Sequence, residues 1–397
     1  MFCLVHNNFM LSHRQSAICG LLTVVWLSFG FALTACMREQ TAVHVETQHN
    51  PKEQSMDSNN MHTSSELCAK THFHDGYEDE IIICALRNED VDNMHRLYNE
   101  AVEALHNVKF DSEEEMISGM RNAKPKFHVV YPIRSLDDIK QLELDYRSFV
   151  PYATSFEVQF VNDMLFTKGS AVNNGDKRIH LRAKGNVAYR RLIFSGQTPN
   201  PTSVERLFIN VNADTVVVHN LKFIHHSPAP AISVDVTGGL IADSVVFENS
   251  EEIDEQMQFA AEPLIVTFST ENRPYDVEIS NSVFRNNHSD GLLGVDVRYL
   301  HPVRNITLRN NIILDNAGSF DISASESALI DRCTISQLSV PALSLNNPNT
   351  KVTIRDSKLD GYVFKFFPSL EYGNSKPESV QRINNSETVG TRYYGLE

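Results

Sequence analysis

Basic residues and histidines gather at two places in this chain, and their types could support proton-transfer chemistry. The two groups contain Lys222, His225 and His226, and then Arg285, His288, Asp290, Arg298 and His301. A lyase or an epimerase needs a cation that neutralises a substrate carboxylate and a base that removes the neighbouring proton. We therefore take Lys222, Arg285, His288 and Arg298 as the candidate catalytic residues. The alternative is that all of these residues are solvated side chains in loops between strands.

A repeated unit of eight residues would position these side chains. Six segments align without gaps, and their first residues are 24, 37, 29, 22 and 24 residues apart. Positions one and three are apolar, position four is polar, position five is mostly Asn, Asp or Ser, and position eight is large and apolar. This pattern predicts a strand, a tight bend and a second short strand in each coil of a solenoid. The units are 216–223, 240–247, 277–284, 306–313, 328–335 and 352–359.

Two columns of polar residues follow from stacking these units. Asn side chains at the bends would stack in register and form a hydrogen-bonded ladder. The fourth position holds His219, Asp243, Ser280, Arg309, Asp331 and Arg355. The last three alternate in sign at a spacing of about 4.8 Å. This arrangement favours a surface charge ladder over an active site.

A third short strand per coil is visible at 231–234, 264–267, 320–322 and 342–345. Three strands per coil, with Asn-Asn-Ile-Ile at 310–313, resemble the right-handed parallel β-helix of pectate lyases and related polysaccharide enzymes. The resemblance implies an all-β solenoid with a ligand groove on the outer face of one sheet. It identifies the fold and leaves the activity open, because one architecture hosts many functions.

The motifs that carry the family's chemistry are missing from the sequence. The paired-Asp and Gly-His-Gly motifs of the galacturonan hydrolases and the WxDH-type motif of pectate lyases are absent. No metal motif of recognised spacing is present, so no metal site is assigned, although Ca²⁺ remains a possible cofactor. An acidic insert at 250–262 could bind a cation or overhang a groove. The alternative for this insert is a solvated acidic loop.

The chain divides into five predicted parts. They are a signal peptide at 1–35, a lipidated Cys with a disordered tether at 36–67, a helical N-terminal cap region at 68–150, the β-helix at 151–368 and a tail at 369–397. Apolar residues at three- and four-residue steps between 91 and 105 predict a helix, and Ser112 and Ser135 resemble two further helix starts. These helices are expected to cover the open end of the solenoid, whose first rungs lie at 156–161 and 178–181. The polar tail would cover the other end or be disordered.

The N-terminus has the layout of a secretory signal. Residues 17–35 are apolar and uncharged, and Leu-Thr-Ala-Cys at 33–36 resembles the lipobox of bacterial lipoproteins, in which the Cys is acylated. An uncleaved anchor or an ordinary secretory signal is the alternative. Met10 lies at a better distance from the apolar segment than Met1 and is a second candidate start. Met37 replaces the Asp that favours inner-membrane retention, so we expect a lipid anchor in the outer membrane of the cell envelope.

The acidic composition argues against two classes of binding partner. The net charge of −15 argues against a nucleic-acid binder and against surface-charge attraction to anionic lipid.

Of six Cys, Cys68 and Cys84 flank a short segment and are the expected disulfide in an oxidising compartment. Cys333 falls at an inward strand position and is expected to be a buried free thiol. The sequence gives no indication of the oligomeric state.

Two hypotheses about function remain. The first is a cell-envelope lipoprotein that binds or processes an acidic polysaccharide, with a lyase or an epimerase as its enzymatic form. The second is a non-catalytic β-helix that serves as an adhesion or envelope scaffold module. The missing motifs favour the second, whereas Tyr275 and Tyr299 could supply aromatic platforms for sugars. Convergence of the candidate residues in one groove would favour chemistry, and scatter around the coil would favour the scaffold.

Overall fold

The computed structural model of the chain describes residues 80–84, 88–106, 108–109, 111–116, 119, 126–149, 152–165, 178–181, 191–224, 230–250, 263–269, 273–289, 291–295, 303–367 and 379–396. The chain separates into two units, 1–61 and 62–397, and all described residues belong to the second. The predicted signal peptide 1–35, Cys36, the tether 36–67 and Cys68 therefore lie outside the described residues.

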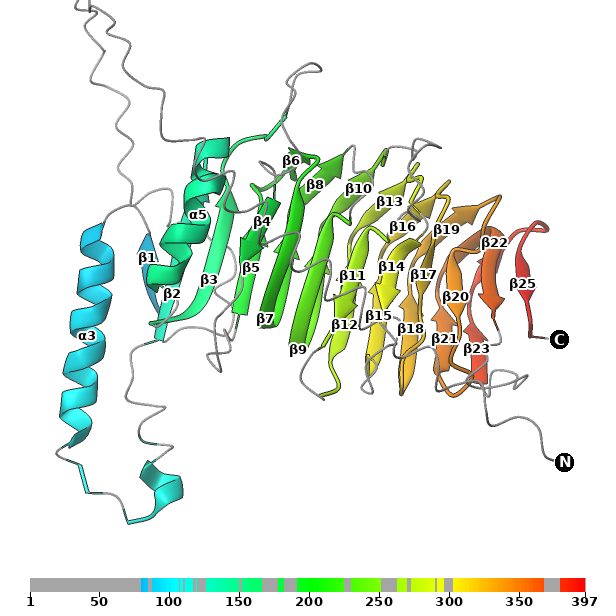
Figure 1. The fold of residues 1–397 in the computed structure, drawn as a ribbon. Coiled ribbons are helices and arrows are strands. Elements are labelled where there is room, and N and C mark those ends of the chain that lie inside the picture. Colours follow the sequence, from blue (N-terminus) through cyan, green and yellow to red (C-terminus); the bar gives the residue numbers. More distant parts are fainter. Residues whose placement is uncertain are drawn as a thin grey trace, which may run out of the picture. The chain divides into compact units, whose positions relative to one another are not determined.

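The second unit consists mainly of parallel strands, each paired with the equivalent strands of neighbouring coils (Figure 1). The strands form three stacks. Stack 1 contains β1 (Glu80–Cys84), β2 (Lys126–Ile133), β3 (Ala153–Phe160), β5 (Arg191–Ser195), the second halves of β7 (Phe208–His219) and β9 (Ile232–Asp243), β12 (Asp276–Ser280), β15 (Asn305–Arg309), β18 (Ser327–Asp331), β21 (Lys351–Arg355) and β23 (Ser379–Ile383).

The other two stacks are made of shorter strands. Stack 2 contains β6 (Thr202–Glu205), β8 (Leu221–Ile224), β10 (Val246–Glu248), β13 (Val283–Arg285), β16 (Ile312–Leu314), β19 (Thr334–Gln337), the first part of β22 (Lys358–Phe366) and β24 (Ser386–Glu387). Stack 3 contains β4 (Arg178–Leu181), the first halves of β7 and β9, β11 (Ile265–Phe268), β14 (Gly291–Val295), β17 (Ser319–Asp321), β20 (Leu343–Leu345), the last part of β22 and β25 (Arg392–Tyr394).

The predicted repeat register is confirmed. The first residues of the six units pair in one column along stack 1, and the eighth residues pair in one column along stack 2. All six fifth-position residues have φ between 50° and 55°. Asn and Asp tolerate this left-handed conformation better than most residues, which explains why they predominate at the bend. The six are Asn220, Ser244, Asn281, Asn310, Arg332 and Asp356.

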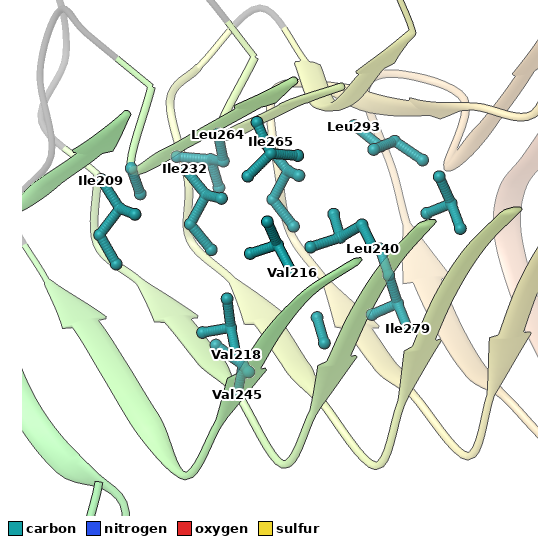
Figure 2. Packing of buried hydrophobic residues seen from close by; sticks show 14 of the residues in the cluster. Ile209, Val216, Val218, Ile232, Leu240, Val245, Leu264, Ile265, Ile279 and Leu293 are labelled. Carbon is teal, nitrogen blue, oxygen red and sulfur yellow. The ribbon is translucent and has the colours of Figure 1, made fainter. Parts of the chain in front are cut away.

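The interior is filled by stacked apolar side chains. Figure 2 shows inward residues of stack 1, such as Val216 and Leu240, in the same cluster as Ile209 and Ile232 of stack 3. On stack 2, the rings of Phe223 and Phe247 are 5.0 Å apart, and those of Phe247 and Phe284 are 4.9 Å apart. Parallel in-register pairing places equivalent side chains of successive coils over one another, so each ring packs on its counterpart.

Buried amides accompany the apolar stack at the second bend of three successive coils. The Asn287 side chain donates to the Phe247 carbonyl at 3.0 Å and to Asn316 Oδ1 at 2.8 Å. Asn316 in turn donates to the Phe284 carbonyl at 3.0 Å, and its backbone N–H donates to Gln337 Oε1 at 2.6 Å. An outer ladder, in which Asn310 donates to Asn281, confirms the predicted stacking of bend amides. These bonds satisfy backbone groups that the bends leave unpaired.

The described part of the predicted cap region contains two long helices and a helical segment at 113–116, which follows Ser112 as predicted. α3 (Asn88–His106) covers the amphipathic segment, and α5 (Leu136–Phe149) begins after Ser135, as predicted. Ser135 and Asp138 exchange backbone-to-side-chain bonds at 2.9 and 3.4 Å, the reciprocal pattern of a capping box. α5 packs against β2 and β4 and places Tyr146 edge-on to Phe156 at 5.1 Å. Among the described residues, no helix combines the length and apolar character needed to cross a membrane.

The sheet extends beyond both boundaries predicted for the β-helix. β1 and β2 lie within the region 68–150, which was predicted to be helical, and β23, β24 and β25 lie within the predicted tail 369–397. β2 is buried on both faces and therefore lacks the alternation that identifies a strand in sequence. β23 to β25 belong to the last described coil and carry mainly polar residues. The described cap region is thus a mixture of helices and strands.

Candidate functional site

Two of the four predicted catalytic residues come together. Lys222 Nζ lies 2.9 Å from Glu248 Oε2, and an Arg285 guanidinium nitrogen lies 2.7 Å from Glu248 Oε1. Burial alone would raise the pKa of Glu248, but the two cations lower it below its ordinary value. Glu248 was missed in the sequence because it stands one position beyond the eight-residue unit. Both cations share one carboxylate, so the trio keeps one net positive charge while each cation already has a partner.

The other predicted site residues do not complete a catalytic group. His288 is exposed, and the chain turns at Asn286, with a φ of 54°, between Arg285 and His288. The His288 backbone N–H donates to the Ser250 hydroxyl at 2.7 Å, which fixes the turn. Arg298 lies outside the described residues, as do His225, His226, Asp290 and His301.

The fourth-position column is a charge ladder, as predicted. Asp331 is 2% exposed and lies 3.0 Å from Arg355, 3.2 Å from Arg332 and 3.4 Å from Arg309. Its hydrogen bond with Arg355 is the largest of the effects that lower its pKa. In the first two units of the same column, Asp243 lies 3.1 Å from His219. These contacts join neighbouring strands of stack 1 on its outer face.

Tyr275 cannot be an aromatic platform for sugars. Its side chain is 1% exposed, and its hydroxyl donates to Thr267 Oγ1 at 3.1 Å. The residue precedes β12, where the alternation places it on the inner side of the coil. Tyr299, the second predicted platform, lies outside the described residues.

Exposed aromatic rings instead lie on the outer face of stack 3, near its C-terminal end. The Tyr362 and Tyr394 rings are 4.7 Å apart in an edge-to-face arrangement. Lys365 Nζ lies 4.2 Å from the centroid of the Phe367 ring. Arg392 pairs in register with Tyr362 and is exposed, as are Phe367 and Tyr394. We call Tyr362, Lys365, Phe367, Arg392 and Tyr394 the aromatic–cationic face.

Strand register continues this face toward earlier coils. Tyr394 pairs with Lys365, Lys365 with Ser344, and Ser344 with Asp321. Ser344 and Ser319 hydroxyls are 3.2 Å apart. On this line the outer face of stack 3 carries a carboxyl group, a hydroxyl that is 7% exposed, a cation and an aromatic ring.

Asp321 is the titratable acid of this line. Burial raises its pKa above the ordinary value, and this outweighs the hydrogen bonds with Ser323 and Asn346 that lower it. A carboxyl group whose folded pKa is raised favours folding when it is protonated, and this contribution is lost as the pH rises through the folded pKa. Ionised Asp321 therefore costs stability at neutral pH.

Asp321→Asn is expected to raise the free energy of unfolding at about pH 7, because the amide mimics the protonated acid. The gain should shrink toward about pH 4, where the wild-type carboxyl group is increasingly protonated. Urea unfolding at both pH values measures this difference. Glu326→Gln, which alters an exposed carboxylate, is the matched control. A gain that is equal at the two pH values would contradict the account.

The prediction for Cys333 is tested by the described residues, whereas those for Ca²⁺ and for the Cys68–Cys84 disulfide are not. Within the described ranges, no group of three or more His, Cys, Asp or Glu residues is arranged to hold a metal ion. Most of the acidic insert 250–262 lies outside those ranges, so Ca²⁺ binding there stays a prediction. Cys333 is confirmed as a buried free thiol, and burial raises its pKa to about 11. The Cys84 side chain and Cys68 are not described, so their disulfide also stays a prediction.

Comparison with known proteins agrees with this architecture. Residues 207–367 match the family model described as "Right handed beta helix region". No curated protein and no solved structure matches the chain. The match covers the six predicted units, and the strand pairing extends to coils on both sides of it. The described part of the chain is thus built around a right-handed parallel β-helix.

Proposed function

We propose that this β-helix binds an acidic polysaccharide along the outer face of stack 3, with the aromatic–cationic face as the main contact. The observation that carries the proposal is that partly or fully exposed rings and cations alternate there on the neighbouring strands β22 and β25. Aromatic rings offer flat apolar surface to the C–H face of a sugar ring. Lysine and arginine supply charge-assisted hydrogen bonds to carboxylates, and arginine can bind them in a bidentate manner.

The charge of the whole chain makes a local cationic surface necessary. At a net charge of −15, most of the protein surface repels an anionic polymer. Lys365 and Arg392 supply positive charge where sugar rings can also stack. Among the earlier coils, Ser319 adds a partly exposed hydroxyl beside this line, whereas Ser344 is only 7% exposed. A chain of several sugars that ran along the stack would contact successive coils at intervals of about 4.8 Å.

Enzymatic processing has less support than binding. Lys222 and Arg285, the cations predicted to neutralise a uronate, already share Glu248. Asp321, with its raised pKa, is the acid–base group nearest in register to the cations of the aromatic–cationic face. An absorbance assay for unsaturated uronates, with and without Ca²⁺, tests for lyase action independently of binding.

We further propose that lipid on Cys36 anchors the β-helix to the cell envelope, on its outer membrane. The support is the sequence alone: an apolar segment that ends in Leu-Thr-Ala-Cys, followed by Met37. Several acyl chains on one Cys would hold the protein stably, since each buried CH₂ contributes about 0.8 kcal/mol. Mass spectrometry of the N-terminal peptide should show acylated Cys36, and an unmodified or uncleaved N-terminus would contradict this.

Affinity electrophoresis of the full chain tests the binding proposal. Gels that contain pectate, alginate or a glycosaminoglycan should retard the chain, and gels that contain a neutral glucan should retard it less. Retardation should weaken as salt is added, because screening reduces the attraction between exposed charges. Equal mobility in all gels would contradict the proposal and would favour the adhesion or scaffold function instead.

A further inference from the structure

A second polar cluster lies on a different stack from the aromatic–cationic face. It is formed by His128 on β2, Ser155 and Glu157 on β3, and Ser195 on β5, all on the outer face of stack 1. Their exposed fractions are 7%, 1%, 2% and 4%. Sequence reasoning missed the cluster because β2 falls in a region predicted to be helical. Its residues come together only through the pairing of three strands.

The distances within the cluster are those of an activated serine. The Ser155 hydroxyl oxygen lies 2.6 Å from His128 Nδ1. His128 Nε2 lies 3.0 Å from Glu157 Oε2, and the Ser195 hydroxyl donates to Glu157 Oε1 at 2.5 Å. A nucleophile, a base that contacts it and an acid that orients the base define the Ser–His–acid arrangement, whatever the fold.

The hydrogen bonds also decide which ring nitrogen acts as the base. A carboxylate only accepts hydrogen bonds, so Glu157 Oε2 requires a proton on His128 Nε2. In the neutral ring, Nδ1 then carries the lone pair and accepts the Ser155 proton. Ser195 fixes the other oxygen of Glu157 and so holds the carboxylate in place. Ser155 is thereby poised to lose its proton to His128.

The neighbouring positions show that this face accepts apolar residues. Val130 and Ile193 occupy adjacent outward positions on β2 and β5, and each is 0–1% exposed. Burying ionisable groups where apolar side chains fit costs stability, and a structural pair of this kind is often replaceable without loss. A buried cluster of four polar side chains in this setting therefore suits a chemical role.

We infer that Ser155 is the nucleophile of an acyl-transfer site that cleaves a small carboxylic ester. Ser155 Oγ bonds to the carbonyl carbon while its proton passes to His128 Nδ1. The bond from that carbon to the alcohol oxygen then breaks, and His128 returns the proton to the departing alcohol. Water, deprotonated by His128, attacks the acyl-serine, which releases the carboxylic acid and restores Ser155. Glu157 and Ser195 are positioning residues.

The burial of Ser155 limits the proposed substrate to small esters. Only 1% of the residue is exposed, so a substrate reaches its hydroxyl only when neighbouring side chains move. The buried apolar neighbours Val130 and Ile193 lower the local dielectric constant and so strengthen the electrostatic interactions inside the site. This inference does not depend on polysaccharide binding, because stack 1 and stack 3 present different faces.

Labelling of the full chain with diisopropyl fluorophosphate, a small serine-directed reagent, tests the inference. Peptide mass spectrometry should find the label on Ser155, and Ser155→Ala should remove it. 4-Nitrophenyl acetate should give a burst of nitrophenolate stoichiometric with the chain, the sign of an acyl-enzyme. Glu157→Gln should slow the labelling at least about a hundredfold while the urea midpoint changes little, because the amide keeps the size but not the acceptor pair.

Two results would overturn the inference. One is the absence of label on Ser155 under conditions that fully label a serine esterase added as a control. The other is a labelling rate of Ser155 that Glu157→Gln and His128→Gln leave unchanged. Ser195→Ala tests whether Ser195 positions the Glu157 carboxylate. This variant should slow the labelling and leave Ser155 as the labelled residue. If a variant fails to fold, the wild-type label and burst still decide the question.

Discussion

Phe284→Ala is expected to lower the free energy of unfolding by about 3–5 kcal/mol. Phe284 is 0% exposed, and its ring lies 4.9 Å from that of Phe247 and 4.8 Å from that of Phe320. Backbone pairing holds the coils at a fixed spacing, so the coils above and below cannot collapse into the cavity. Urea unfolding followed by circular dichroism measures the loss.

A matched control uses the neighbouring strand of the same stack. Ile312 pairs with Val283, next to Phe284, but it points outward and is 39% exposed. Ile312→Ala should therefore cost less than about 1 kcal/mol. Equal losses for the two variants would show that the stacked rings are not the main contribution of stack 2 to the core.

Asn316→Ala is expected to destabilise the protein by about 2–4 kcal/mol, because a buried group that loses its partner costs about 1–3 kcal/mol. The Asn316 side chain is the donor to the Phe284 carbonyl, and its oxygen accepts from the Asn287 backbone N–H at 3.2 Å. Asn316 is 2% exposed, so water does not readily replace these bonds. The same urea unfolding experiment measures the change.

Thr307→Ala is the control for this substitution. Thr307 lies on the outer face of β15, where its side chain is partly exposed. Removing its hydroxyl should change the free energy of unfolding by less than about 1 kcal/mol. A small effect for Asn316→Ala as well would mean that the buried amides contribute to register rather than to stability.

The fold could be predicted from the sequence wherever one coil repeats the pattern of the next. Positions one, three and eight of each unit bury apolar side chains, and position five requires a residue that tolerates a positive φ. These are local demands that the sequence records directly. β2 and β23 escaped because the first is buried on both faces and the second carries few apolar residues.

The candidate sites depend on contacts that no local pattern records. Glu248 meets Lys222 and Arg285 only because β8, β10 and β13 are neighbours in stack 2. Tyr362 and Tyr394 meet across β22 and β25, although β23 and β24 lie between them in the sequence. His128 and Ser155 meet through the register of β2 and β3. Residue types alone singled out Lys222 and Arg285 but not Glu248, the carboxylate that both contact.

Binding of a fluorescently labelled oligo-uronate to the full chain, measured by anisotropy, tests the central claim most directly. The double substitution Lys365→Glu and Arg392→Glu should weaken binding at least about tenfold, equivalent to about 1.4 kcal/mol. Lys358→Glu makes the same kind of change on the same strand as Lys365, but on stack 2, and should leave the affinity unchanged. Unchanged binding by the double variant, or an equal loss with Lys358→Glu, would contradict recognition of the polysaccharide at the aromatic–cationic face.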